Sequence, residues 1–243
     1  MTAASPVLLA LLEVQAHDTA IDQLRHRKAS LSEKTELADV RSRRAQLQAA
    51  RDEVGGRRDE IATRQDKAEA DIAVAERRIG EIDTRMRSGQ VSASRDLQAM
   101  EHEIATIRER VSALEDAGLE AMEECEPLDV EVDGFDSQIE SLTADETRLL
   151  ASIAAEEAEI DSSAADTRDA RAAVAANVPD DLLKRYEDLR SRLAGVGAAK
   201  LDGHRCSGCH LTLPPTEIDR LKREPPDALV YCEQCGRILV RVD

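Results

Sequence analysis

A seven-residue repeat of apolar side chains dominates the middle of this chain. It begins at Leu97 and reaches Val174, and a second series starts three residues later at Met100. The first series is Leu97, Ile104, Val111, Gly118, Cys125, Val132, Ile139, Glu146, Ile153, Ile160, Thr167 and Val174. Apolar a and d positions sustained over about eight heptads indicate a coiled coil, in which helices pack along one seam.

A rougher repeat precedes this one. It holds one register from Val40 to Ile82, whereas Leu24 and Leu31 lie out of phase, so we expect a stutter near residues 32–37. Between the repeats lies MRSGQVSASRD, residues 86–96, in which Gly89 suits a helix C-terminus and Ser92 or Ser94 a helix N-cap. The two arms, about 5–86 and 94–176, are nearly equal, which favours an antiparallel hairpin within one chain.

The charge distribution supports the same pairing. The net charge is −17 and aromatic residues make up 1% of the chain, too few for an ordinary globular core. Segment 25–67 contains twelve Lys or Arg and eight Asp or Glu, whereas segment 115–161 contains seventeen acidic residues and one basic residue. Three arginines occupy d-like positions and are expected to reach acids such as Asp129, Asp133 or Asp136 on the other arm. They are Arg44, Arg51 and Arg58.

Residues that weaken helices are expected to lie opposite one another on the two arms. Gly55 and Gly56 are expected to lie nearly opposite Cys125 and Pro127, which predicts a bend there. Cys125 falls on an a position and is interpreted as a small buried hydrophobe.

The fold predicted is mainly α: a long antiparallel coiled-coil hairpin, a short helix and a small C-terminal β zinc ribbon. The predicted modules are residues 1–177 for the hairpin, with its tip at about 86–96, residues 178–197 for the short helix and linker, and residues 198–243 for the ribbon. Within the ribbon, strand-like runs occur at 198–201, 211–213, 228–231 and 238–242.

Two Cys-x-x-Cys pairs lie in the predicted ribbon. Cys206 and Cys209 form one pair, and Cys232 and Cys235 form the other. Two such knuckles supply the four thiolates of a tetrahedral zinc site, and a shell filled by thiolates predicts one structural Zn²⁺ rather than a catalytic one. A dithiol redox pair, an iron–sulfur centre, and ligation by His204 or His210 are the alternatives.

The whole chain resembles a bacterial family with a long coiled-coil hairpin and a C-terminal four-cysteine zinc ribbon. The resemblance rests on SASRDLQAMEHEI at the tip, VPDDLLKRYEDLR before the ribbon, GVGAAKLDGHRCSGCHLTLPP and YCEQCGRILV. It implies that the four cysteines above are zinc ligands. Most members are uncharacterised, and some are associated with flagellar regulation or with transcription and secretion components through protein contacts. No flagellar specificity follows from these residues.

A non-enzymatic protein-interaction adaptor or chaperone-like scaffold is therefore expected, as a monomer or homodimer. The expected partner contact is at the tip. It comprises Arg85, Met86, Arg87, Val91 and Arg95. A ribbon face around Leu211, Leu213, Ile218 and Leu221 is a second candidate, although these residues suit the ribbon's own core better.

The alternative function is binding of DNA or RNA by the ribbon, as in a transcription-associated factor. Its candidate contacts are Arg220, Lys222 and Arg223, although residues 200–243 hold seven basic and seven acidic residues and lack the net positive charge that phosphates require. The apolar run Val7–Leu12 lacks the features of a signal peptide, so we expect a cytoplasmic protein without membrane contact.

Overall fold

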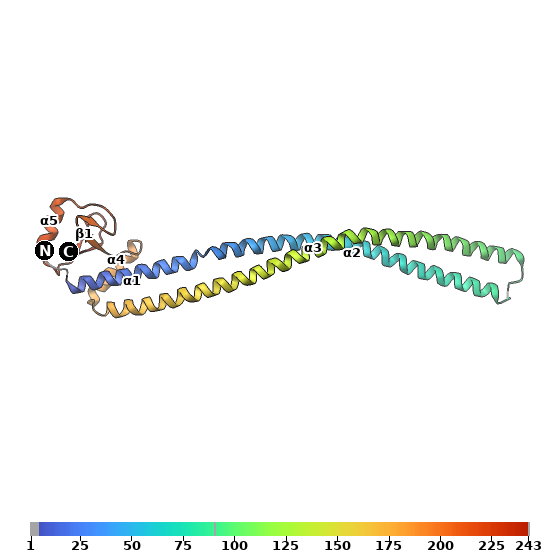
Figure 1. Ribbon diagram of the computed structural model, residues 1–243, viewed down its shortest axis with the longest axis horizontal. Helices are drawn as coiled ribbons and strands as arrows, with labels where there is room; N and C mark the ends of the chain where they lie inside the picture. The colour runs from blue at the N-terminus through green and yellow to red at the C-terminus, as the bar shows by residue number, and fades with distance from the viewer. Residues whose placement is uncertain (1–4, 90, 243) are drawn as a thin grey trace. The chain divides into compact units, whose positions relative to one another are not determined.

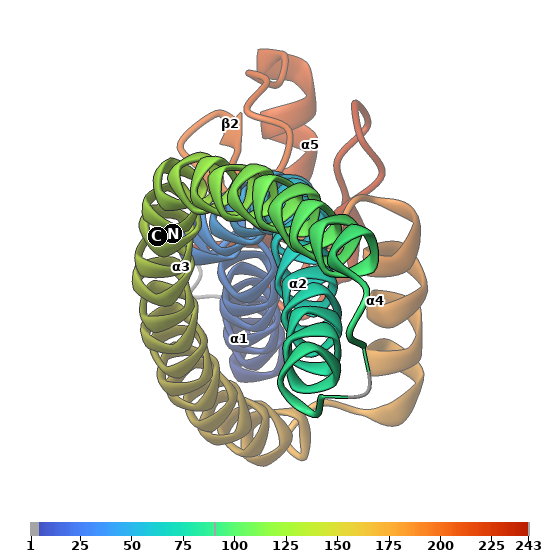
Figure 2. The ribbon, with the colours of Figure 1, turned by 90° about the vertical axis from the view of Figure 1, so that its right-hand side faces the viewer.

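The computed structural model describes residues 5–89 and 91–242, and in this part of the chain the predicted helical hairpin is confirmed. Helices α1 (Pro6–Ala29) and α2 (Ser32–Arg87) form the first arm, and α3 (Ser94–Ala175) forms the second. Figures 1 and 2 show α2 and α3 side by side where the chain turns between them. Gln90, the centre of the predicted turn, lies outside the described residues, as do residues 1–4 and 243 of the predicted modules. Gly89 has φ +72°, the left-handed conformation expected after a helix.

The first arm is interrupted once, at Ser30 and Leu31, just before the predicted stutter. The Ser30 hydroxyl donates to the His26 carbonyl oxygen at 2.8 Å, and the Lys34 ammonium donates to the Lys28 carbonyl oxygen at 2.6 Å. The second bond gives a partner to a carbonyl at the end of α1, whereas the His26 carbonyl oxygen also accepts from the Ser30 N–H at 3.0 Å.

Contacts divide the chain into two compact units, one of residues 36–149 and one of the segments before and after it. These units cut across the boundaries expected at 177 and 197, which stay predictions. In the first unit the buried side chains occupy the predicted seam. They include Val54, Ala68, Ala75 and Ile82 on α2, and Ala121, Cys125, Leu128 and Leu149 on α3.

Ion pairs join the two arms where the charge pattern predicts them. Arg51 Nε lies 3.1 Å from Asp136 Oδ1, and one heptad further along, Arg58 Nε lies 2.9 Å from Asp129 Oδ1. Arg44 pairs instead with Glu146 at 2.6 Å, together with Arg41 at 2.7 Å. Hydrogen bonding from Arg41, with the charge of Arg44, holds the pKa of the Glu146 carboxyl below its ordinary value.

Both helices run without interruption through the positions that weaken them. α2 includes Gly55 and Gly56, and α3 includes Pro127. Cys125 is buried, as expected, and its Sγ lies 3.8 Å from the Arg58 carbonyl oxygen. The segment after Gly55 and Gly56 therefore lies opposite Cys125, as predicted, and the bend itself stays a prediction.

The second unit carries α4 (Asp180–Arg192), α5 (Pro215–Arg223) and a four-stranded sheet, grouped near the start of α1 (Figure 1). The strands are β1 (Ala198–Asp202), β2 (Arg205–Cys206), β3 (Val230–Tyr231) and β4 (Ile238–Arg241), in the order β2-β1-β4-β3. β1 and β4 are parallel, with Ala199 opposite Leu239, whereas β2 and β3 pair antiparallel with their neighbours. The run 211–213 contributes only a bridge between Thr212 and Arg205.

The sheet is buried on both faces. Ala198, Ile238 and Val240 face a core formed with Leu11 of α1 and Tyr186 of α4. Alternate residues face a second core that contains α5 and the cysteines. The second core includes Ala199, Leu201, Leu239, Leu213, Ile218 and Leu221. The ribbon is therefore packed against helices of its own unit.

A buried polar network ties α1 to the chain that enters the sheet. The Gln15 amide oxygen accepts from the backbone N–H of Gly197 at 2.7 Å, and its nitrogen donates to the Gly195 carbonyl oxygen at 3.0 Å. One turn later, Asp18 accepts from the Tyr186 hydroxyl at 2.7 Å and from Arg171 Nε at 2.9 Å. A single helical face thus satisfies polar groups from α3, α4 and the strand entry.

In the described part of the chain, none of the helices combines the length and the hydropathy that crossing a bilayer requires.

Tyr186→Phe tests the buried network. Tyr186 is fully buried, and the substitution removes a hydrogen bond to a carboxylate, which is worth about 1.5–3 kcal/mol. We expect the free energy of local opening of α1 and α4, measured by amide hydrogen exchange, to fall by about that amount. Tyr231→Phe removes the same hydroxyl from an exposed position and serves as the control. Equal protection in the two variants would contradict the assigned role of the network.

Candidate metal centre

The two Cys-x-x-Cys segments fold into equivalent knuckles. In the first, the His210 N–H donates to the Cys206 carbonyl oxygen at 2.8 Å; in the second, the Gly236 N–H donates to the Cys232 carbonyl oxygen at 2.7 Å. The N–H groups of Cys206 and Cys232 donate in turn to the carbonyls of Leu211 and Arg237. Both knuckles thus close through the same pair of backbone hydrogen bonds.

The turn in each knuckle needs one residue with positive φ. Gly236 supplies it in the second knuckle (φ +73°), but in the first it is His210 (φ +61°) rather than Gly208. Gly208 has a different role, since a Cβ at this position would lie 2.5 Å from Arg237 Cδ and 3.0 Å from Ala199 Cβ. In the first knuckle the glycine therefore permits a close approach and not the turn, a difference that sequence spacing alone does not reveal.

The four cysteine sulfurs converge within 4.8 Å of one another. Sγ of Cys206 lies 4.0 Å from that of Cys235, and Sγ of Cys209 lies 3.9 Å from that of Cys232. These distances are about twice that of a disulfide bond. Tetrahedral zinc with Zn–S bonds of about 2.3 Å places its sulfurs about 3.8 Å apart, so the four thiols fit the ion.

The environments of the thiols differ. Burial raises the pKa of Cys206, and it raises the pKa of Cys232 to about 12. Burial acts on Cys235 in the same direction, but hydrogen bonds from the backbone and side chain of Arg237, together with those from Cys232 and Cys209, outweigh it and lower the pKa to about 7. Arg237 thus favours the thiolate form that a metal requires.

Arg237 is held in place by the segment that leads into the sheet. Its Nε donates to the Val196 carbonyl oxygen at 2.9 Å, and a terminal nitrogen donates to the Leu193 carbonyl oxygen at 3.0 Å. Outer partners of this kind fix the geometry of the ligands. This role was not predictable from the sequence, because the two carbonyls lie 41 and 44 residues before Arg237.

Within residues 5–89 and 91–242, these four cysteines are the only cluster of Cys, His, Asp or Glu arranged to hold a metal ion. His204 and His210 are not part of it. Cys125 lies in the hairpin seam, as expected.

The predicted tip residues lie on both sides of the turn. Arg85, Arg87 and Arg95 are exposed, and Met86 and Val91 are half-buried. Arg87 pairs with Asp83 at 2.8 Å. Among the described residues, Arg85 and Arg95 form no ion pair, so the turn presents cationic groups beside apolar ones.

The predicted nucleic-acid contacts lie on α5. Arg220 forms ion pairs with Glu217 at 2.6 Å and with Glu233 at 3.5 Å, and its hydrogen bond holds the pKa of the Glu217 carboxyl below its ordinary value. Lys222 and Arg223 are exposed. Of the alternative ribbon face, Leu213, Ile218 and Leu221 are buried in the core, as expected, and Leu211 is half exposed.

Other ribbon arginines are engaged by backbone carbonyls. Arg205 donates to the His210 carbonyl oxygen at 2.8 Å. Arg241 donates to the carbonyls of Leu221, Glu224 and Pro225, which end α5. Helix α5 was not expected from the sequence, because nine residues flanked by prolines give little periodicity.

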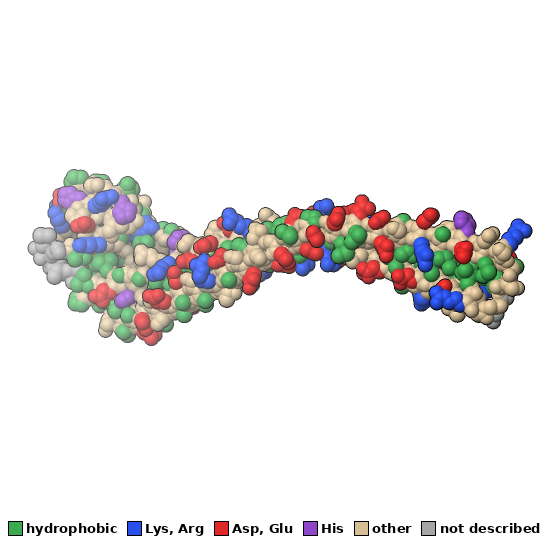
Figure 3. All heavy atoms as spheres, turned by 45° about the vertical axis from the view of Figure 1, so that its right-hand side comes forward, with side chains coloured by type: hydrophobic (Ala, Val, Ile, Leu, Met, Phe, Trp, Pro, Cys, Tyr) green, Lys and Arg blue, Asp and Glu red, His purple; other side chains and the backbone are tan. Residues whose placement is uncertain are grey.

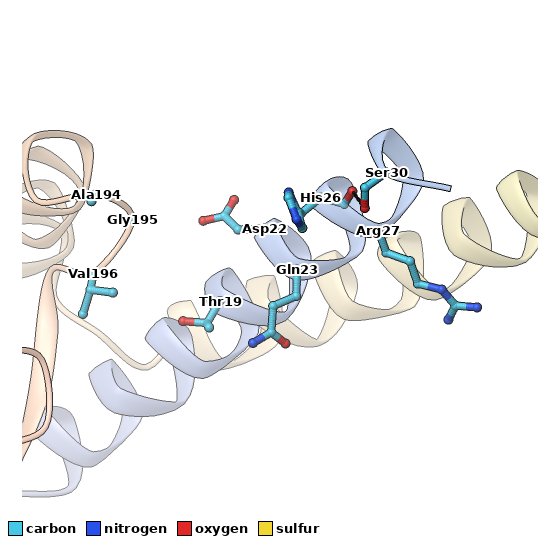
Figure 4. A pocket seen from close by; sticks show the side chains of 9 residues that line it. All are labelled: Thr19, Asp22, Gln23, His26, Arg27, Ser30, Ala194, Gly195 and Val196. Carbon is cyan, nitrogen blue, oxygen red and sulfur yellow. Dashed lines mark hydrogen bonds between the residues drawn. The ribbon is translucent and has the colours of Figure 1, made fainter. Parts of the chain in front are cut away.

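The groove in Figure 4 lies between α1 and the turn at 194–196. Asp22 on its wall accepts hydrogen bonds from Arg25 and Arg190, so its charge is balanced within the unit. Thr19 and Ser30 also line the groove, but their hydroxyls donate to the backbone carbonyl oxygens of Gln15 and His26 at 2.8 Å.

The fold and the cysteine cluster together define a class, that of coiled-coil hairpin proteins with a four-cysteine ribbon. Residues 14–194 match the model of the CT398-like coiled coil hairpin domain, and residues 205–239 match that of the C4-type zinc ribbon domain. The chain belongs to the CT398-like coiled coil hairpin family.

Similar proteins extend over nearly the whole chain. Uncharacterised proteins from two strains of Mycobacterium tuberculosis are 26% identical to it, over 96% of this chain and 94% of their own length. A solved structure from Mycobacterium smegmatis has a TM-score of 0.87 at 26% identity and covers 99% of this chain and 100% of its own.

Two more distant structures share the fold. CT398 from Chlamydia trachomatis has a TM-score of 0.66 at 18% identity, covering 97% of both chains. The HP0958 protein from Helicobacter pylori has a TM-score of 0.53 at 15% identity, covering 99% of both chains. The hairpin-and-ribbon architecture is thus found in proteins of low sequence identity.

Gly208→Ala tests the close approach of Arg237 to the first knuckle. The added methyl overlaps the Arg237 side chain, which its two carbonyl partners hold in place. Overpacking of about 1–3 kcal/mol corresponds to roughly a fivefold to 150-fold loss of zinc affinity, measured by competition with a chromophoric chelator. Gln234→Ala, at an exposed position of the second knuckle, should leave the affinity unchanged. If Gly208→Ala bound zinc as tightly as the wild type, the close approach of Arg237 would not matter for the metal site.

Proposed function

We propose that this chain is a non-enzymatic, zinc-binding coiled-coil protein of the cytoplasm that acts as a protein-interaction adaptor or scaffold. The observation that carries the proposal is the hairpin turn, where exposed Arg85, Arg87 and Arg95 lie beside half-buried Met86 and Val91. Arginine and methionine are enriched at protein interfaces. The proposal holds for a monomer and for a homodimer.

One structural Zn²⁺ is proposed for the ribbon. Four thiolates fill a tetrahedral shell and leave no position for water or substrate, so the ion would stabilise the fold rather than act in catalysis. Cys206 and Cys232 also belong to the core that contains α5, so the ion would link the two knuckles through that core.

Cys232→Ser tests the zinc assignment. We expect loss of the bound zinc, measured by elemental analysis, and loss of protection of the ribbon amides in hydrogen exchange. Because α2 and α3 pair through contacts of their own, the helical circular dichroism signal should change little. Cys125→Ser is the matched control, since Cys125 lies outside the cluster, and it should retain zinc. Full zinc retention by Cys232→Ser would overturn the assignment.

The second candidate function is nucleic-acid binding by the ribbon. Exposed Lys222 and Arg223 on α5 favour it. Against it, Arg220 is balanced by two carboxylates, and Arg205, Arg237 and Arg241 bind backbone carbonyls. Few cationic groups are then left for phosphates, which bind in proportion to the number of Lys and Arg side chains that contact them.

Affinity capture of the zinc-loaded protein from its native cytosol, with and without nuclease, distinguishes the two functions. For the adaptor, we expect specific proteins that survive nuclease and are lost when Arg85, Arg87 and Arg95 are replaced by Glu. Replacing Arg43, Arg57 and Arg108 by Glu makes the same charge change at exposed positions on the arms and should have no effect. Recovery of nucleic acid that depends on Lys222 and Arg223, with no protein resistant to nuclease, would favour the ribbon function and reject the adaptor.

A further inference from the structure

A groove of about 430 Å³ opens between α2 and α3. All of its residues belong to the unit of residues 36–149. Its apolar lining consists of Ala68, Ile72, Leu114, Gly118, Leu119 and Met122. Ala68 is buried, and Ile72 and Leu114 are half-buried, so the bottom of the groove is the coiled-coil seam itself.

The groove exists because the seam lacks a side chain at one position. Gly118 occupies an a position of the heptad series, between Val111 and Cys125, where a coiled coil normally places a large apolar residue. A Cβ built on Gly118 meets no heavy atom within 4 Å. The facing residue Ala68 is too small to fill the space, so the seam has a gap open to solvent.

Apolar side chains border this gap on the outside of α3. Leu119 is 59% exposed and Met122 is 49% exposed, which leaves large hydrophobic side chains in contact with water. Figure 3 shows hydrophobic side chains exposed among acidic ones along the hairpin. Exposed apolar surface next to a groove is a common feature of interaction sites.

The charge around the groove is negative. Glu69, Glu115 and Asp116 line it, and among the described residues none of the three forms an ion pair. On α3, no Lys or Arg occurs between Arg110 and Arg148. On α2, Arg64 is paired with Glu124, which leaves Lys67 as the nearby cation.

This charge selects among occupants. A second copy of the chain that docked through its α3 would bring one acidic helix against another, and like charges repel. Arginines of its more basic α2 already pair with its own α3. Nucleic acid is excluded by the same argument. A cationic helix with an apolar stripe matches both the carboxylates and the apolar lining, because apolar anchors at helical spacing insert into grooves of this kind.

We propose that the Gly118 groove docks a basic amphipathic helix of a partner protein, with one aliphatic side chain of that helix filling the gap above Gly118. The inference rests on the protein-binding role proposed above, but it uses a surface separate from the turn. The carboxylates would pair with Lys or Arg on both sides of the apolar stripe, and Met122 would adapt to the shape of the inserted side chain.

The test uses a fluorescent peptide of about 18 residues, five helical turns, made of Leu and Lys with Leu at i, i+3, i+4 and i+7. We expect the zinc-loaded full chain to bind it, and Gly118→Leu to weaken binding by about tenfold or more, because the new side chain occupies the gap. Gly118→Leu should not lower the melting temperature, since the site is open and Leu favours helix over Gly.

Matched controls separate docking from simple charge attraction. Gly134→Leu makes the same change on α3, also in open space, and should bind as the wild type does. A peptide of the same composition with scrambled order should bind at least about tenfold more weakly. The combined variant Leu119→Gln, Met122→Gln alters only exposed residues and should weaken binding even if Gly118→Leu proves to disturb the hairpin.

Equal binding of the ordered and scrambled peptides, or unchanged binding in both the Gly118 and the Leu119/Met122 variants, would overturn the proposal. The combined variant Arg85→Glu, Arg87→Glu, Arg95→Glu should bind the peptide as the wild type does. Its loss of captured partners concerns the proposed adaptor function alone, so failure of one proposal is distinguishable from failure of the other.

Discussion

A pair of helices can bury only the single stripe of side chains along which they touch, and this limit governs the hairpin. In the unit of residues 36–149, many seam residues are only half-buried, because among its described residues no third element covers the outer faces of α2 and α3. Apolar burial alone therefore discriminates weakly between registers that differ by one heptad. Arg51 with Asp136 and Arg58 with Asp129 repeat at the heptad spacing on both arms, and the unequal charge of the arms favours their pairing over pairing between like arms.

The other unit overcomes the same limit by adding a layer. The small sheet has α1 and α4 on one face and α5 with the cysteines on the other, so its short strands are buried on both sides. Gln15 and Asp18 then satisfy polar groups that this burial would leave without partners. The four-cysteine cluster is thus built on a sheet that helix α1 of the hairpin supports.

Features encoded by residues close together in the sequence were predictable. The heptad repeat predicted the bounds of α3 almost to the residue, and the paired Cys-x-x-Cys segments predicted the thiol cluster. Contacts made through space were not. Nothing near Arg237 in the sequence indicates that it reaches Val196 and Leu193, and nothing near Gly208 shows that its missing side chain admits Arg237. Gly118 was visible in the repeat, but whether α2 fills the space beside it depends on the packing of Ala68.

The hydrogen bond between Gln15 and Gly197 joins residues 182 positions apart, which affects the order of folding. Closing a flexible loop becomes more costly in entropy as it lengthens, and distant contacts form slowly. After Arg41 pairs with Glu146, the loop that separates Gln15 from Gly197 shrinks to the segments 15–41 and 146–197. Pairing of the helices therefore shortens the loop that the hydrogen bond between Gln15 and Gly197 must close, so docking of the strand entry onto α1 depends on the hairpin. The four thiols span only residues 206–235, so their cluster closes a much shorter loop and does not depend on that order.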